Sequence, residues 1–230
     1  MKAAINKHRV FFALLPDDEV ASHLLALGHH VAARGGGRLT PVQNLHLTLA
    51  FMGSVTSTQM ETLVTCAQSV SDAVSDELIA AFGAENDSAG EPDWRVRLNR
   101  LGFWPQGGVL WAGCRLPPCH QRRLFAEPSA MRLALHAGAL PWILAARLKS
   151  ALSAAGLPPP MTPHFVPHVT LARGVRCASL PRLGSPLDWS VREFVLLESI
   201  PQAMHPRYEV RAVFPLYSDT LCSDTLYSDN

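Results

Sequence analysis

The chain has 230 residues, of which 48% are hydrophobic and 17% charged, so it can bury the core of a compact domain. This composition excludes a wholly disordered chain, which has few apolar residues and many charges. The formal net charge of +1 excludes a uniformly basic nucleic-acid coat but allows a local phosphate site.

Neither export nor membrane anchoring is expected. The longest apolar stretch, residues 139–146, is interrupted by Pro141 and is far shorter than the roughly 20 residues of a membrane-spanning helix. The apolar residues 10–15 are too few for a secretion signal and lead directly into Pro16. Five cysteines, an odd number without close pairing, argue against a disulfide framework. We therefore expect a cytoplasmic protein with free thiols.

The first part of the chain predicts two strands and two helices. Residues 10–14 are typical of a buried strand, and an aspartate at 17–18 can cap a helix with apolar residues at helical spacing. Residues 45–51 alternate in character, which predicts a strand with one apolar face, and residues 57–67 predict a second helix. The apolar face of that strand is expected to enter the core through Leu45, Leu47, Leu49 and Phe51.

The remainder adds strands around one long helical stretch. Residues 117–157 are helical in composition, although Pro128, Gly138 and Pro141 would interrupt a helix. The whole order of elements indicates an α+β fold. Residues 216–230 form three five-residue units, and we interpret them as a low-complexity tail. The further strands are predicted at 94–99, 109–113, 166–172, 194–199 and 208–214.

A short repeat carries the chemistry. His46–Ala50 recurs as His168–Ala172, with four of the five residues identical. Side chains at i and i+2 of a strand point to the same side, so each copy presents an imidazole and a threonine hydroxyl together. If the two halves face each other, two histidines and two threonines line one groove.

Two facing imidazoles suit phosphodiester chemistry. Histidine titrates near neutral pH, so one ring can accept a proton from the attacking group while the other donates to the leaving oxygen. The hydroxyls of Thr48 and Thr170 can donate to the non-bridging oxygens, where charge has to be stabilised. Arg173, three residues after Thr170, can hold the same phosphate with two hydrogen bonds. This scheme requires neither a metal ion nor a cofactor.

The two motifs resemble a known family. Asn44–Phe51 and Pro167–Arg173 are similar to the paired motifs of the two-histidine phosphoesterase superfamily, and in particular to the bacterial RNA 2′,3′-cyclic phosphodiesterases, also called LigT or 2′-5′ RNA ligases. The resemblance implies an α+β fold of two pseudo-symmetric lobes. Each lobe would be an antiparallel sheet with helices packed outside, around a central active-site cleft. Residues 1–215 would then form a single bilobed domain, followed by the tail at 216–230.

The resemblance also implies a reaction and roles for these residues. The family opens a terminal 2′,3′-cyclic phosphate of RNA to a 2′-phosphomonoester. By this resemblance His46 is the proton donor and His168 the proton acceptor, while Thr48, Thr170 and Arg173 bind the phosphate. The expected partner is an RNA or oligonucleotide with a 2′,3′-cyclic phosphate end. We expect a monomer that acts without a metal, a cofactor or a membrane.

Several alternatives stay open. The activity could be 2′-5′ ligation or cleavage of another cyclic or 2′-5′ phosphodiester, and the protein could bind RNA ends without turnover. The two motifs are so alike that the residues alone leave the acid and base assignments open. His164 and His168 have the spacing of metal ligands, but the prolines before each of them oppose a helix there. Aromatic residues that could stack on a base, although core packing is the default, are Phe11, Phe51, Trp104 and Phe165.

Overall fold

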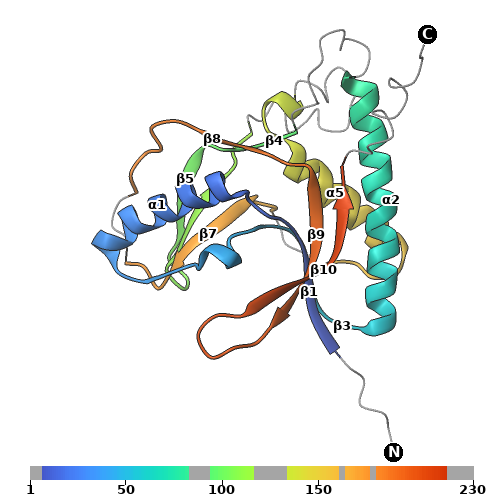
Figure 1. The fold of residues 1–230 in the computed structure, drawn as a ribbon, viewed down its shortest axis with the longest axis horizontal. Coiled ribbons are helices and arrows are strands. Elements are labelled where there is room, and N and C mark those ends of the chain that lie inside the picture. The colour runs from blue at the N-terminus through green and yellow to red at the C-terminus, as the bar shows by residue number, and fades with distance from the viewer. Residues whose placement is uncertain (1–6, 83–93, 117–133, 161–163, 177–179, 217–230) are drawn as a thin grey trace, which may run out of the picture.

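The computed structural model describes residues 7–82, 94–116, 134–160, 164–176 and 180–216, which fold as the predicted α+β arrangement (Figure 1). The first part of the helical stretch predicted at 117–157 and the tail beyond Leu216 lie outside these residues. In chain order the elements are β1 (Lys7–Leu14), α1 (Asp18–Gly35), β2 (Arg38–Leu39), η1 (Val42–Asn44), β3 (Leu47–Thr56), α2 (Ser57–Phe82), β4 (Arg95–Leu98), β5 (Arg100–Trp104), β6 (Val109–Gly113), α5 (Leu140–Ala154), β7 (His168–Arg173), β8 (Leu187–Ser190), β9 (Glu193–Ile200) and β10 (Arg207–Pro215).

One antiparallel sheet joins both halves of the chain. Its strand order in the described residues is β10-β9-β1-β3-β7-β6-β5, with β2 paired to β7, while β4 and β8 form a separate ribbon. The two predicted half-sheets therefore meet edge to edge at β3 and β7, where Leu47 pairs with Val169. This seam brings the two histidine motifs onto neighbouring strands.

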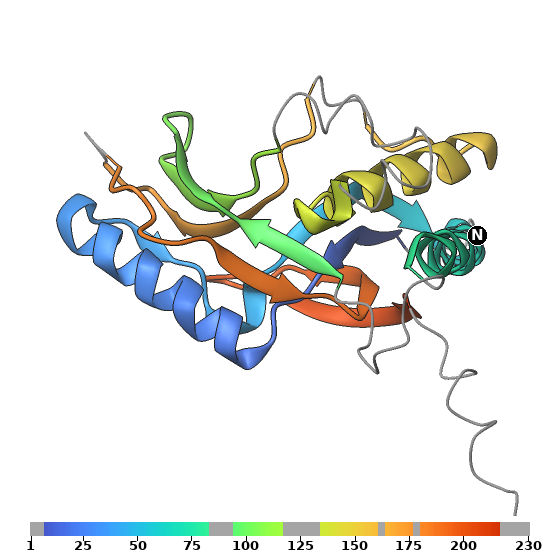
Figure 2. The same cartoon turned by 90° about the horizontal axis from the view of Figure 1, so that it is seen from above.

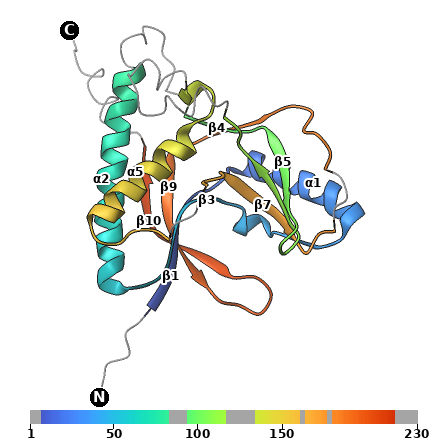
Figure 3. The ribbon, with the colours of Figure 1, turned by 180° about the vertical axis from the view of Figure 1, so that it is seen from behind.

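Helix α1 lies over one half of this sheet, and helices α2 and α5 lie over the other half (Figures 1 and 3). Helix α1 packs on β7 and β2, whereas α2 and α5 pack on each other and on strands β1, β3 and β10. Seen from above, α1 lies at the corner diagonally opposite α2 and α5 (Figure 2). The side chain of Asp17 caps α1 by accepting a 2.8 Å hydrogen bond from the Val20 amide, as predicted. No helix among the described residues is long and apolar enough to cross a membrane.

From Val10 to Leu14, strand β1 is buried on both faces. Its residues Val10, Phe12 and Leu14 point into the main core. This core is one continuous cluster that lies under α1 as well as under α2 and α5. On the other face, Phe11 and Ala13 form a smaller apolar cluster with two residues of β9, Val195 and Leu197. This smaller cluster lies directly beneath the candidate site, because Phe11 also lines the pocket beside His46.

Several element boundaries differ from the prediction. Strand β3 begins at Leu47, so His46 lies immediately before the strand, after the short helical turn η1. Helix α2 continues to Phe82, well beyond the predicted end. Pro141 does not interrupt a helix but occupies the first turn of α5, where its missing N–H would be unpaired in any case. Strands β2, β5 and β8 were not predicted, because β2 and β5 lack a clear alternation of apolar residues and β8 alternates over only four residues.

A β-bulge in β3 corrects the prediction for Phe51. Phe12 of β1 pairs with Ala50 and Ala13 pairs with Thr48, so Leu49 has no partner on β1. The extra residue shifts the alternation by one position. Leu49 and Ala50 are both buried, and Phe51, expected in the core, is 40% exposed on the face that carries Thr48.

Candidate active site

The two histidine rings are held in the same way. Nδ1 of His46 lies 2.8 Å from the carbonyl oxygen of Asn44, and Nδ1 of His168 lies 2.7 Å from that of Val166. A carbonyl only accepts, so each Nδ1 is protonated and donates. The Nε2 atom is therefore the position at which each ring can accept or release a proton toward a ligand.

The seam between β3 and β7 places both motifs on one face of the sheet. Leu47 and Val169 pair across the seam and are fully buried, so their chain neighbours point to the opposite face. Continued by one residue in each direction, this antiparallel register sets His46 across from Thr170 and Thr48 across from His168. All four side chains are half-buried, as ligand-contacting groups at the base of a groove would be.

The electrostatic environment disfavours a positive charge on either ring. Burial, together with the charges of His168 and Arg173, lowers the pKa of His46 to about 4, although its bond to Asn44 acts in the other direction. Burial and the charge of Arg173 likewise lower the pKa of His168, against the opposing effect of its bond to Val166. The lowered pKa values of both rings and the nearby guanidinium of Arg173 together indicate an environment that favours an anion.

Arg173 lies where it acts on the whole site. It ends β7, and its Cα pairs with that of Arg38 in β2. Its positive charge lowers the pKa of both imidazoles and opposes the burial that raises the pKa of Tyr208. The guanidinium therefore lies close enough to His46, His168 and Tyr208 to influence all three, as a phosphate ligand at this position would.

A pocket of about 440 Å³ opens on the His46 side of the site. The rings of Phe11 and Tyr208 contact the His46 imidazole at centroid distances of 4.9 Å and 5.1 Å. The guanidinium of Arg9 lies 5.0 Å over the ring of Phe51 at the pocket wall. The pocket is lined by Arg9, Phe11, His46, Thr48, Phe51, Ser199, Pro201, Gln202, Pro206 and Tyr208.

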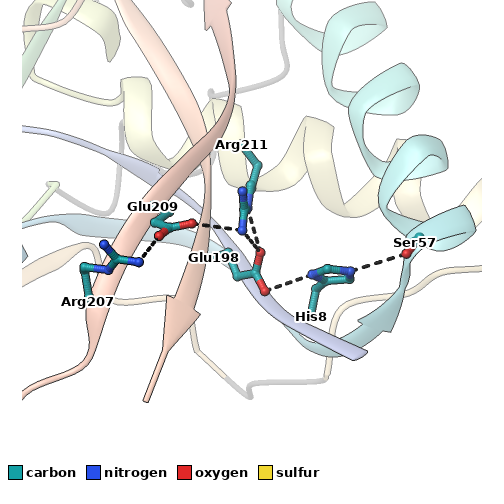
Figure 4. Close-up of polar contacts among 6 residues, drawn as sticks. All are labelled: His8, Ser57, Glu198, Arg207, Glu209 and Arg211. Carbon is teal, nitrogen blue, oxygen red and sulfur yellow. Dashed lines mark hydrogen bonds and ion pairs between the residues drawn. The ribbon is translucent and has the colours of Figure 1, made fainter. Parts of the chain in front are cut away.

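A polar network supports this pocket from the opposite face of the sheet (Figure 4). Glu198 is 8% exposed, and its carboxylate accepts hydrogen bonds from His8 at 2.9 Å and from Arg211 at 2.6 Å. Burial raises the pKa of Glu198, but the hydrogen bonds from His8 and Arg211 hold this pKa below its usual range. Arg211 also pairs with Glu209 at 2.9 Å, and Glu209 binds Arg207.

Four members of the network, His8, Glu198, Arg207 and Glu209, each lie one residue from a pocket residue. His8 precedes Arg9, Glu198 precedes Ser199, and Tyr208 lies between Arg207 and Glu209. Because neighbouring residues of a strand point to opposite faces, the network fixes the back of the same backbone that carries the pocket wall. Asn44 adds a further tie, since its amide donates a 2.8 Å hydrogen bond to the carbonyl of Pro206.

Sequence reasoning missed part of this site. Arg9, Tyr208 and Gln202 come from strands and a hairpin whose pairing order no local pattern encodes, and only the spatial order β10-β9-β1-β3 unites them. The metal interpretation of His164 gains no support, because no group of three or more metal-binding side chains occurs in the described part of the chain. Phe165 contacts Trp142 and is not among the residues that line the pocket.

Comparisons with known proteins relate this fold and its paired histidines to the LigT-like phosphoesterases. Residues 14–111 match the family model described as LigT like Phosphoesterase. The chain is 26% identical over 192 residues to the RNA 2′,3′-cyclic phosphodiesterase of Escherichia coli strain K12, an alignment that covers 83% of this chain and 86% of that protein. The chain is therefore similar to LigT-like phosphoesterases, over residues 14–111 in the family model and over most of its length in the alignment with the E. coli protein.

Solved structures extend the likeness over most of the chain. The crystal structure of E. coli LigT complexed with 3′-AMP matches with a TM-score of 0.66 and 25% identity, covering 93% of this chain and all of that one. A protein of Thermus thermophilus matches with a TM-score of 0.57 and 25% identity, over 92% of this chain and 99% of its own. The α+β architecture predicted from the sequence is thereby confirmed.

Proposed function

We propose that the protein is an RNA 2′,3′-cyclic phosphodiesterase, which hydrolyses a terminal cyclic phosphate to a 2′-phosphomonoester as a monomer and without a metal ion. The observation that carries this proposal is the matched orientation of two imidazoles, each held through Nδ1 by a carbonyl two residues earlier. The similarity to a curated RNA 2′,3′-cyclic phosphodiesterase supports the same reaction and substrate class.

In this mechanism the two rings act on opposite sides of the phosphorus atom. Nε2 of His168 accepts a proton from the attacking water as its oxygen bonds to phosphorus. Nε2 of His46 donates a proton to O3′ as the bond between phosphorus and O3′ breaks, which leaves the phosphate on O2′. General acid and general base catalysis each contribute about 10²–10⁴-fold in rate.

Three groups hold the phosphate during this step. The hydroxyls of Thr48 and Thr170 donate to non-bridging oxygens, and the guanidinium of Arg173 supplies the positive charge that the transition state requires. The bound phosphate also places a negative charge beside the His46 ring. It raises the pKa of His46, so the ring becomes protonated and competent as a donor in the complex.

The pocket beside His46 suits the nucleoside that bears the cyclic phosphate. Its volume of about 440 Å³ and its exposed Phe51 ring fit a base that stacks on an aromatic side chain. Because stacking does not depend on base identity, the Phe51 ring can hold a nucleoside with any base.

Hydrolysis of adenosine 2′,3′-cyclic phosphate in excess EDTA tests the proposal. We expect turnover, with 2′-AMP as the product. His46→Gln and His168→Gln should each lower kcat by at least about 100-fold while circular dichroism shows an intact fold. Binding of the nucleotide without turnover would identify an RNA-end binding protein instead, and loss of activity in EDTA would refute a metal-independent mechanism.

A further inference from the structure

A serine, a histidine and a glutamate form a continuous hydrogen-bonded chain behind the pocket, on the opposite face of the sheet (Figure 4). Nε2 of His8 lies 3.3 Å from Oγ of Ser57, and Nδ1 of the same ring lies 2.9 Å from Oε1 of Glu198. The histidine is 49 residues from the serine and 190 residues from the glutamate in the sequence, so only the fold brings them together. The proposed phosphodiesterase mechanism uses none of these three side chains.

Strand pairing sets the positions of the three side chains. Val10 of β1 pairs with Glu198 of β9, and His8 lies two residues before Val10 on the same face of β1. His8 and Glu198 are therefore diagonal neighbours on paired strands, which lets their side chains meet. On its other edge, β1 pairs with β3, where His8 is the partner of Val55. Ser57 follows Val55 by two residues as α2 begins, and this brings the serine to the histidine.

The hydrogen bonds determine which nitrogen of His8 carries the proton. Burial raises the pKa of Glu198, but the bonds from His8 and Arg211 lower it overall, so the carboxylate is ionised at neutral pH and only accepts. Nδ1 of His8 therefore donates to Glu198. In the neutral ring this leaves a lone pair on Nε2, which accepts the proton of the Ser57 hydroxyl.

A second donor holds the carboxylate of Glu198 in this orientation. Nε of Arg211 lies 2.6 Å from Oε2, the oxygen that His8 does not use, and Arg211 is itself held by Glu209 at 2.9 Å. Each oxygen of Glu198 thus has its own donor, so rotation of the carboxylate would break a charge-assisted hydrogen bond. An acid fixed in this way orients the imidazole and stabilises the positive charge that the ring acquires when it takes a proton.

The serine is accessible and stands at the start of a helix. Ser57 is exposed and is the first residue of α2, directly after β3 ends at Thr56. Thr56 and Gln59 cap this helix reciprocally, through bonds of 2.9 Å and 3.2 Å between the amide of each and the side-chain oxygen of the other. The amides of Ser57 and Thr58, in the first turn, have no partner within the helix. They can donate to a negative oxygen that forms beside Oγ of Ser57.

We propose that Ser57, His8 and Glu198 form a second catalytic site, in which Ser57 is a nucleophile toward small activated esters. The observation that carries this proposal is the order of the contacts, from nucleophile to base to orienting acid. None of the three residues lines the pocket beside His46, so the activity is separate from that of the two histidines at the seam. Because Ser57 is exposed, the site suits small esters with a good leaving group.

The reaction proceeds through an acyl-serine. Oγ of Ser57 bonds to the carbonyl carbon of the ester while its proton passes to Nε2 of His8. The bond from that carbon to the leaving oxygen then breaks, and His8 gives the proton to this oxygen. In the second half, water attacks the acyl carbon and gives a proton to His8, which returns it to Oγ of Ser57 as the carboxylic acid leaves. Glu198 stays ionised throughout and stabilises the imidazolium.

Labelling of the full chain with diisopropyl fluorophosphate, located by peptide mass spectrometry, tests the nucleophile. Oγ of Ser57 bonds to phosphorus, fluoride leaves and His8 takes the serine proton, so the label remains on Ser57. Ser54 is the internal control, because it is an exposed serine of β3 that forms no hydrogen bond with a histidine among the described residues. We expect Ser57 to react at least about 100-fold faster than Ser54, the contribution of a general base.

Two variants separate the nucleophile from its base. Ser57→Ala should lower the rate of p-nitrophenyl acetate hydrolysis at least about 10-fold, whereas the matched variant Ser54→Ala should leave it unchanged. His8→Gln keeps an amide that can donate to Glu198 but removes the base, so labelling of Ser57 should fall to the rate at Ser54. The comparison of the two serines within the wild-type protein decides the outcome even where His8→Gln does not fold.

Labelling of Ser57 no faster than that of Ser54 would overturn the proposal, as would ester hydrolysis that Ser57→Ala leaves unchanged. The two activities are also tested against each other. Ser57→Ala should hydrolyse adenosine 2′,3′-cyclic phosphate at the wild-type rate, and His46→Gln should keep the labelling of Ser57. Loss of cyclic phosphate hydrolysis in a folded Ser57→Ala variant would overturn the separation of the two sites. Absence of cyclic phosphate hydrolysis in the wild-type protein would refute only the proposed phosphodiesterase.

Discussion

An anion in the site should raise the pKa of His46 by about three units. The pKa of His46 is about 4, because the ring is buried and lies beside His168 and Arg173. One negative charge about 4 Å from the imidazolium, at an effective dielectric constant of about 20, stabilises it by about 4 kcal/mol. At about 1.36 kcal/mol per pKa unit, this moves the pKa of His46 to about 7.

The direction of this shift links binding to pH. The anion favours the protonated ring, so the complex takes up a proton between about pH 4 and 7. Affinity for the anion should therefore strengthen as the pH falls from about 7 toward about 4. Sulfate is a suitable probe because its own charge is constant over this range, and its second negative charge can only increase the shift.

Titration of the histidine ring nitrogens by NMR, with and without saturating sulfate, measures the effect. The spectrum of His46→Gln assigns the resonance. A shift of the His46 pKa by less than about one unit at saturating sulfate would refute the idea that this ring directly faces the phosphate.

Three further changes test other parts of the structure. Phe51→Ala should lower kcat/KM for a nucleoside 2′,3′-cyclic phosphate by about 5- to 150-fold with the unfolding free energy nearly unchanged, since the ring is 40% exposed; steady-state kinetics decide this, and an unaffected kcat/KM would show that no base stacks there. Glu198→Gln should lower the free energy of unfolding by about 1.5–3 kcal/mol, because His8 and Arg211 lose a buried charged acceptor; urea unfolding at about pH 7 measures this, and a loss below about 0.5 kcal/mol would contradict a supporting role. Gly102→Ala should cost about 1–3 kcal/mol because its Cβ meets the Trp111 indole, whereas Gly184→Ala, with open space around its Cβ, should be nearly neutral in the same assay; equal effects would mean that the indole does not rest on Gly102.

The alternation of side-chain directions around each histidine could be predicted from the sequence because it depends only on local residues. A strand with period two places His168 and Thr170 on one side, and neither partners nor loops change that result. The helix after Asp17 was predictable for a similar reason, since a capping side chain and helical spacing lie within one short segment.

The residues of the pocket wall could not be predicted from the sequence, because their arrangement depends on pairing between distant segments. Strict alternation assigned Phe51 to the core, and the unpaired Leu49 that reverses this assignment is visible only once β1 lies beside β3. Tyr208 reaches His46 because β9 and β10 return to pair beside β1. The space over Gly102 and Gly113 becomes meaningful only when β5, β6 and β7 are neighbours, which brings the Trp111 indole over both of them.

The strand order has a consequence for the chain during its synthesis. A nascent polypeptide that has emerged only as far as β8 already contains both histidine motifs, yet one edge of β1 still lacks its neighbour β9. Four consecutive residues of that strand, Val10–Ala13, would then expose unpaired backbone groups and apolar side chains to the cell. Strands β9 and β10 therefore complete the sheet, and the pocket beside His46 forms only after both of them have left the ribosome.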